Sequence, residues 1–244
     1  MLFLLFASYA VVLSIALAAA GHWTTADRRG GAYRDRRMRV LIVGATGGTG
    51  RELLAQALGR GHTVTALVRD PSKLQSSHAL LTVVQGDVLD EASVGRAMEG
   101  QEAVLCALGH RHFFYPTRIL SAGTRNILRA MDTHGTRRLV VETSLGIGDS
   151  VGRVGLYYTL FVILPFYFWD KTRQERAIAK SDVDWVIVRP AMLTSGEKRG
   201  VYRHGANIGS FFWTARISRA DVADFMLNQL ASDTYLKTAP GVCG

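Results

Sequence analysis

The sequence predicts an α/β fold built on a doubly wound parallel sheet with helices on both faces. Three observations support this prediction. From Met38 onward, short apolar runs alternate with helix-like stretches, which is typical of parallel strands joined by helical crossovers. The first apolar run breaks into a glycine-rich turn that opens a helix. Polar residues follow several of the other runs, where the carboxyl ends of parallel strands would form one ligand-binding edge.

The expected strands are six runs rich in branched apolar residues, at 40–43, 63–68, 81–84, 103–107, 139–142 and 185–188. Helices are expected at 50–58, 91–98, 117–133, 170–180 and 219–230. Ser218 or Arg219, with Asp221, begins the last helix, because short polar side chains accept hydrogen bonds from the free N–H groups of a first turn.

The glycine-rich turn lies in residues 39–51, where glycines follow the spacing G-x-x-G-x-x-G. The first lets the chain turn sharply, the second lets a diphosphate approach the backbone, and the third lets the helix pack closely on the strand. N–H groups at the helix start would then face the phosphates. Spacing alone also fits a tight turn in some other α/β protein. The predicted cofactor-binding residues here are Gly44, Thr46, Gly47, Gly48, Thr49 and Gly50.

Arg69 ends the second expected strand, and it indicates which dinucleotide is bound. A cofactor without a 2′-phosphate usually calls for an acidic residue there, whereas arginine can pair with a 2′-phosphate. We therefore expect NADPH rather than NADH, with Arg51 as a second candidate contact. The alternative is that Arg69 points into solvent while Asp70 caps the turn before Pro71.

Two further strand ends offer cofactor contacts. Asp87 and Val88 follow the third run, where the carboxylate could accept a hydrogen bond from an adenine amino group or simply close a turn. Ala107, Leu108 and Gly109 follow the fourth run and are mostly small, so that ribose and phosphates could pass close to the backbone.

The histidines and cysteines do not predict a metal centre or a disulfide framework. His110 and His112 are two residues apart without a third ligand in view, which favours solvated loop histidines over a metal site or a proton shuttle. Cys106 lies in a strand-like run and Cys243 next to the C-terminus, which fits a reducing compartment.

Ser144, Tyr167 and Lys171 are the candidate catalytic residues. Ser144 follows the fifth strand, where its hydroxyl could donate a hydrogen bond to developing negative charge on an acceptor. Tyr167 and Lys171 are four apart and share a helix face if the helix begins at Pro165; the ammonium would then favour proton donation by the phenol. Lys171 could also contact the cofactor ribose or the substrate. A strand-closing serine and a packing tyrosine are the structural alternatives.

The N-terminal 37 residues differ from the rest, so we expect a segment 1–37 followed by a cofactor-binding domain, 38–244, with a small C-terminal substrate region. Residues 2–20 form an uncharged apolar run, followed by an arginine-rich linker. A signal peptide, a membrane anchor with the catalytic domain in the cytosol, and a misassigned start before Met38 all fit this pattern. The domain is expected in the cytoplasm, free or anchored.

The formal net charge of +9 is partly concentrated in that linker. Without an aromatic-interleaved basic stripe, this charge favours membrane flanking and anion binding over nucleic-acid binding. The expected partner is a small acceptor molecule, and the oligomeric state is left open.

From Met38 to its end, the chain resembles the atypical short-chain dehydrogenase/reductases. Within them it is similar to the NAD(P)H-binding group that contains flavin and biliverdin reductases and has NmrA-like relatives. The matching segments are GATGGTG at 44–50, LVRDPSKL at 67–74, QGDV at 85–88, GTRNILRAM at 123–131, ETSLG at 142–146 and ISRADVADFMLNQL at 217–230, with Arg189-Pro190 in order between the last two.

The resemblance implies a Rossmann fold, NADPH and hydride transfer to a flat conjugated, flavin-like, quinone-like or carbonyl acceptor. It implies cofactor or active-site positions at the glycine turn, Arg69, 87–88, 107–109 and Ser144, with Pro190 as a further cofactor contact. Two departures are visible: Met192 stands where the flavin reductase has a site histidine, and the flavin reductase lacks the long apolar run at 155–169. A non-catalytic, NmrA-like NADP(H) sensor and an epimerase or dehydratase of the extended group stay as alternatives.

Overall fold

The computed structural model describes residues 36–74, 76–109, 117–150, 153, 165–210 and 214–244. Six parallel strands form the main part of one sheet: β1 (Arg39–Val43), β2 (Thr63–Val68), β3 (Leu81–Gln85), β4 (Ala103–Cys106), β5 (Arg138–Glu142) and β6 (Asp184–Pro190). Their spatial order, β3-β2-β1-β4-β5-β6, reverses direction beside β1. The predicted Rossmann-type doubly wound fold is confirmed, and in such a fold a ligand is expected where β1 and β4 end.

Four short strands complete the C-terminal part. β10 (Gly241–Cys243) extends the main sheet parallel to β6, and β8 (Arg203–Gly205) pairs antiparallel with β10. β7 (Met192–Thr194) and β9 (Arg216–Ser218) form a separate parallel pair. None of the four was expected, because three residues are too few to produce a periodic sequence pattern.

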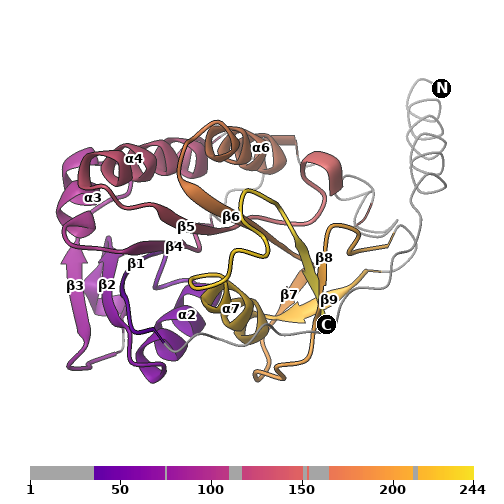
Figure 1. Ribbon diagram of the computed structural model, residues 1–244, viewed down its shortest axis with the longest axis horizontal. Coiled ribbons are helices and arrows are strands. Elements are labelled where there is room, and N and C mark those ends of the chain that lie inside the picture. Colours follow the sequence, from indigo (N-terminus) through magenta and orange to yellow (C-terminus); the bar gives the residue numbers. More distant parts are fainter. Residues whose placement is uncertain (1–35, 75, 110–116, 151–152, 154–164, 211–213) are drawn as a thin grey trace.

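In the described part of the chain, five helices cover the two faces of the sheet (Figure 1). α2 (Gly48–Gly59) and α7 (Arg219–Asn228) lie on one face. α3 (Glu91–Met98), α4 (Ile119–His134) and α6 (Pro165–Ala179) lie on the other, and single 3₁₀ turns occupy Pro71–Lys73 and Gly148–Ser150. The helix expected from residue 170 begins five residues earlier in the structure, at Pro165, because proline is well suited to a first helical position.

Alternating side chains divide the core into two layers. In β1, Val40 and Ile42 face the layer under α2 and α7, whereas Leu41 and Val43 face the layer under α3, α4 and α6. All four side chains are at most 1% exposed. Burial on both faces explains why these strands are continuous apolar runs.

The N-terminal segment falls almost wholly outside the described residues, so the signal-peptide, anchor and start-site predictions stay predictions. Among the residues that are described, no helix is both long and apolar enough to cross a bilayer.

Candidate functional site

The turn between β1 and α2 depends on glycine at two positions. Gly44 has φ +91°, and a Cβ there would lie 2.5 Å from the carbonyl oxygen of Ala107. A Cβ on Gly50 would lie 2.0 Å from the carbonyl oxygen of Gly44. The first and third glycines therefore allow two close backbone approaches, one between the turn and the residue after β4 and one between α2 and the turn.

The N-terminus of α2 suits an anion. Gly47 and Gly48 are exposed, no described side chain caps the helix, and the first turn contains no acidic residue. The Gly47 N–H donates to the Gly44 carbonyl at 2.9 Å, which closes the turn. The first N–H groups of a helix have no partner within the helix itself. Free N–H groups and the helix dipole together favour negative charge there.

A cavity of about 310 Å³ adjoins this turn and is lined by Thr46, Arg69, Asp70 and Lys73. Asp70 caps the 3₁₀ turn by accepting from the Ser72 N–H at 3.1 Å, as the alternative interpretation of this strand end expected, and lies 3.3 Å from the Lys73 ammonium. The hydrogen bond from Ser72, aided by Lys73, lowers the pKa of Asp70. Arg69 is exposed and forms no ion pair with a described residue, so its guanidinium is available to a phosphate.

The residues that follow β3 and β4 were also predicted to contact the cofactor. Asp87 closes its own turn, with Oδ1 accepting from the Leu89 N–H at 2.9 Å, and the Val88 carbonyl accepts from Asn126 Nδ2 at 3.0 Å. Ala107 is buried against the glycine turn, whereas Gly109 is exposed. The adenine and ribose contacts predicted for residues 87, 88 and 107–109 stay predictions.

Ser144 and Lys171 both form hydrogen bonds with backbone carbonyls just beyond the carboxyl end of β5. The Lys171 side chain is 2% exposed, and Nζ donates to the Thr143 carbonyl at 3.0 Å. Half-buried Ser144 donates its hydroxyl to the Leu145 carbonyl at 2.9 Å. The sequence placed Ser144 at this edge and Lys171 on a following helix, and in the structure both donate to carbonyls of the segment 143–145. Tyr167 lies in α6 four residues before Lys171, but its side chain is outside the described part.

Glu142 is a buried acid at this edge that sequence reasoning missed. Its Oε1 accepts from the Thr49 hydroxyl at 3.0 Å, so one predicted cofactor residue is already hydrogen-bonded to β5. Burial raises the pKa of Glu142, although Lys171, Thr49 and Arg219 act in the opposite direction. A glutamate as the last residue of an otherwise apolar strand is the signal that could have revealed it.

A second buried polar group fixes the end of β6. Arg189 donates to both carboxylate oxygens of Glu175, at 3.1 Å through Nε and 2.7 Å through Nη2, and also pairs with Asp149. Glu175 in turn accepts from the Thr143 hydroxyl at 2.7 Å. The adjacent Pro190 carbonyl accepts from the Leu145 N–H at 3.0 Å, which positions the loop that carries Ser144. Direct contact of Pro190 with a cofactor stays a prediction.

The other predicted residues lie apart from this edge or outside the described chain. Arg51 is exposed in the first turn of α2. His110 and His112 are outside the described residues, and the described part contains no cluster of histidine, cysteine and acidic side chains that could hold a metal. Cys106 is buried, which raises the pKa of its thiol to about 11.

Comparison with known proteins provides the family context of this site. A family model described as NAD(P)H-binding matches residues 44–233, from the first glycine of the turn to beyond α7. A 3-diazoavenalumate denitrifying reductase of Streptomyces sp. is 31% identical over 186 residues, which are 69% of this chain and 60% of that protein. A photosystem II assembly factor of Synechocystis sp. is 26% identical over 222 residues, 85% of this chain and 63% of that protein. The chain thus spans about three fifths of the length of these curated relatives.

Solved structures show the same fold. A short-chain dehydrogenase/reductase from Veillonella parvula in complex with NADP has a TM-score of 0.72 and 18% identity, with 86% of this chain and 95% of that chain covered.

Proposed function

This chain belongs to the NAD(P)H-binding family of atypical short-chain dehydrogenase/reductases, and from that premise we propose that it is an NADPH-dependent reductase. The observation that carries the proposal is the 310 Å³ cavity in which Thr46 of the glycine turn and Arg69, the residue after β2, line the same space. The turn fits a diphosphate, and the arginine fits a phosphate on the adenosine ribose. The chain's own residues therefore suit the cofactor.

The proposed preference for NADPH follows from charge. Asp70 is beside Arg69, but Asp70 is already paired with Lys73 and hydrogen-bonded to Ser72, so it does not neutralise the guanidinium. Two cations and one engaged carboxylate around a single cavity favour a dianionic 2′-phosphate over the neutral ribose hydroxyl of NADH.

The cofactor, when bound, supplies hydride chemistry, and the chain supplies orientation and protons. We assign acceptor positioning to the Ser144 hydroxyl, which can exchange its bond with the Leu145 carbonyl for one to an acceptor oxygen or nitrogen. Lys171 holds the Thr143 carbonyl and so fixes the backbone that presents Ser144. Water, Tyr167 or Lys171 delivers the proton.

The acceptor class is proposed to be flat and conjugated, or a carbonyl compound. One relative is named a reductase, which supports reduction as the reaction type in the family. Met192, in β7, stands where the resemblance to flavin reductases implies a histidine, so that side chain cannot protonate an acceptor here. This difference argues against tetrapyrrole reduction and in favour of acceptors that need only one positioned donor.

The test begins with binding. We expect the full chain to bind NADPH in calorimetry more tightly than NADH, and then to oxidise NADPH, followed at 340 nm, with at least one acceptor from a panel of flavins, quinones and conjugated carbonyl compounds. Absence of heat with either cofactor at millimolar excess would remove the proposal.

A non-catalytic NADP(H)-binding regulator is the second candidate, and one structural observation favours it. The Ser144 hydroxyl and the Lys171 ammonium both donate to backbone carbonyls, an arrangement that a purely structural role would also produce. The relative named an assembly factor is compatible with such a role. This candidate predicts tight NADPH binding without turnover on any acceptor.

A further inference from the structure

Arg219, the first residue of α7, lies over the glycine turn although it is far from that turn in the sequence. A Cβ built on Gly48 would be 2.6 Å from both Cδ and Nε of the Arg219 side chain. Gly48 is the first residue of α2, so this arginine covers the helix N-terminus at which a diphosphate is expected.

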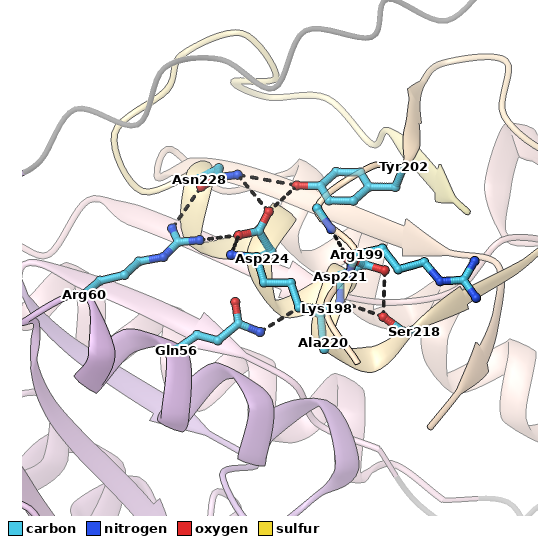
Figure 2. Close-up of polar contacts among 11 residues, drawn as sticks. Gln56, Arg60, Lys198, Arg199, Tyr202, Ser218, Ala220, Asp221, Asp224 and Asn228 are labelled. Atoms are coloured by element: carbon cyan, nitrogen blue, oxygen red, sulfur yellow. Dashed lines mark hydrogen bonds and ion pairs between the residues drawn. The ribbon is translucent and has the colours of Figure 1, made fainter. Parts of the chain in front are cut away.

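The residues on either side of Arg219, Ser218 and Ala220, form hydrogen bonds that hold the start of α7 in place (Figure 2). Ser218 caps α7 by accepting from the Asp221 N–H at 3.0 Å, and Asp221 accepts from the Arg199 N–H at 2.8 Å. Gln56 of α2 donates to the Ala220 carbonyl at 2.8 Å, next to Arg219 itself. The start of α7 is therefore fixed to α2.

A second set of contacts joins the same two helices further along. Asp224 of α7 pairs with Arg60 at the end of α2 at 2.5 Å and with Lys198 at 2.6 Å, and accepts from the Tyr202 hydroxyl at 2.8 Å. Burial alone would raise the pKa of Asp224, but its bonds to Lys198 and Tyr202 and the charge of Arg60 lower it. The ionised Asp224 carboxylate thus holds α7 against the end of α2 through its ion pair with Arg60.

The Arg219 side chain itself is only loosely engaged. It is half-buried, and Nη1 donates to the Ser195 hydroxyl at 3.2 Å. Arg219 forms no ion pair with any described residue, and buried Glu142, which it attracts, is bound to Thr49 instead. A guanidinium on a fixed backbone, without a paired carboxylate and against an uncapped helix N-terminus, is suited to an incoming anion.

We propose that Arg219 binds the diphosphate of the dinucleotide at the N-terminus of α2, which its side chain covers. This inference rests on the proposed function and deepens it, because it divides the cofactor between two arginines. Arg69 takes the phosphate on the adenosine ribose, and Arg219 takes the bridging diphosphate. The Ser195 contact would also connect the diphosphate site to the loop after β7.

The experiment compares two ligands that differ in the diphosphate. NADPH carries both phosphate groups, whereas adenosine 2′-monophosphate carries only the ribose phosphate. We expect Arg219→Ala to weaken NADPH about 10- to 100-fold, the range for a lost charge-assisted hydrogen bond, and to leave adenosine 2′-monophosphate unchanged. Calorimetry measures the affinity for NADPH, and displacement of bound NADPH measures the affinity for adenosine 2′-monophosphate.

Two further variants complete the design. Arg219→Lys should recover part of the NADPH affinity, since the ammonium keeps the charge without the planar fork. Arg216→Ala, which removes an exposed arginine of the preceding strand, should change neither affinity. Equal NADPH binding by Arg219→Ala and the parent, or an equal loss for both ligands, would overturn the assignment while the proposed function stands. Failure of the parent to bind NADPH would overturn both.

Discussion

Two glycines of α2 should respond in opposite directions to the same substitution. A Cβ on Gly50 would lie 2.0 Å from the Gly44 carbonyl oxygen, whereas nothing lies within 4 Å of a Cβ on Gly59 at the other end of the helix. Both substitutions to alanine replace glycine in one helix with the better helix former. Any difference between them therefore measures the approach of α2 to the turn.

The size of the difference follows from the geometry. An ordinary carbon–oxygen contact is about 3.3 Å, so the new methyl group must open the 2.0 Å approach by about 1.3 Å. The opposing atoms are backbone, which cannot rotate away, and overpacking at its upper end costs about 3 kcal/mol. A helix-propensity gain of about 1 kcal/mol leaves a net loss of about 2 kcal/mol for Gly50→Ala. Gly59→Ala should gain about 0.5–1 kcal/mol.

Thermal unfolding followed by circular dichroism measures both effects. For a chain of this size 1 kcal/mol corresponds to about 2–4 °C, so Gly50→Ala should lower Tm by about 4–8 °C and Gly59→Ala should raise it by about 1–4 °C. NADPH affinity should fall only in Gly50→Ala, because only there does the helix start move. A Gly50→Ala protein that melts with the parent and binds NADPH equally well would refute the reasoning.

Three further predictions concern charge and hydrogen bonding at the site. Arg69→Ala should weaken NADPH about tenfold in calorimetry and leave NADH nearly unchanged, because only NADPH carries the 2′-phosphate; equal losses would remove the assignment. Ser144→Ala should reduce NADPH oxidation about 10- to 100-fold with unchanged NADPH affinity if the hydroxyl positions the acceptor, and an unchanged rate would exclude that role. Burial raises the pKa of Glu142 above its ordinary 4.5, so this group destabilises the fold as pH rises from 4.5 through the raised pKa. Glu142→Gln should therefore gain Tm relative to the parent between pH 4.5 and pH 8, and a constant difference across that range would contradict the raised pKa.

The parallel sheet was predictable because its pattern is local. A run buried on both faces must be apolar along its whole length, and such runs predicted β2 at its observed bounds and the other five main strands to within two residues at either end. The glycine turn was equally visible, since its close approaches exclude every side chain larger than hydrogen. Ser218 or Arg219 was expected to begin the last helix because short polar residues favour caps, and it is Ser218 that accepts from the Asp221 N–H.

The polar contacts at the carboxyl edge could not be predicted, because their partners are far apart in sequence. Thr49 and Glu142 are 93 positions apart in the sequence, and Gly48 and Arg219 are further apart still. Single-residue patterns cannot specify such pairs. The sequence marked Arg189 only as part of the family resemblance and did not single out Glu175, although the structure buries the two as a bidentate pair. A buried ion pair gains little stability over apolar packing, so its placement here is better explained by positioning. Glu175 accepts hydrogen bonds from both the Arg189 guanidinium and the Thr143 hydroxyl, and Lys171 donates to the Thr143 carbonyl. The side chain and the carbonyl of the residue before Ser144 are therefore both held. A hydroxyl such as that of Ser144 can meet an acceptor at one defined position only if its backbone is held in place. The sequence shows the hydroxyl but not the distant groups that hold it.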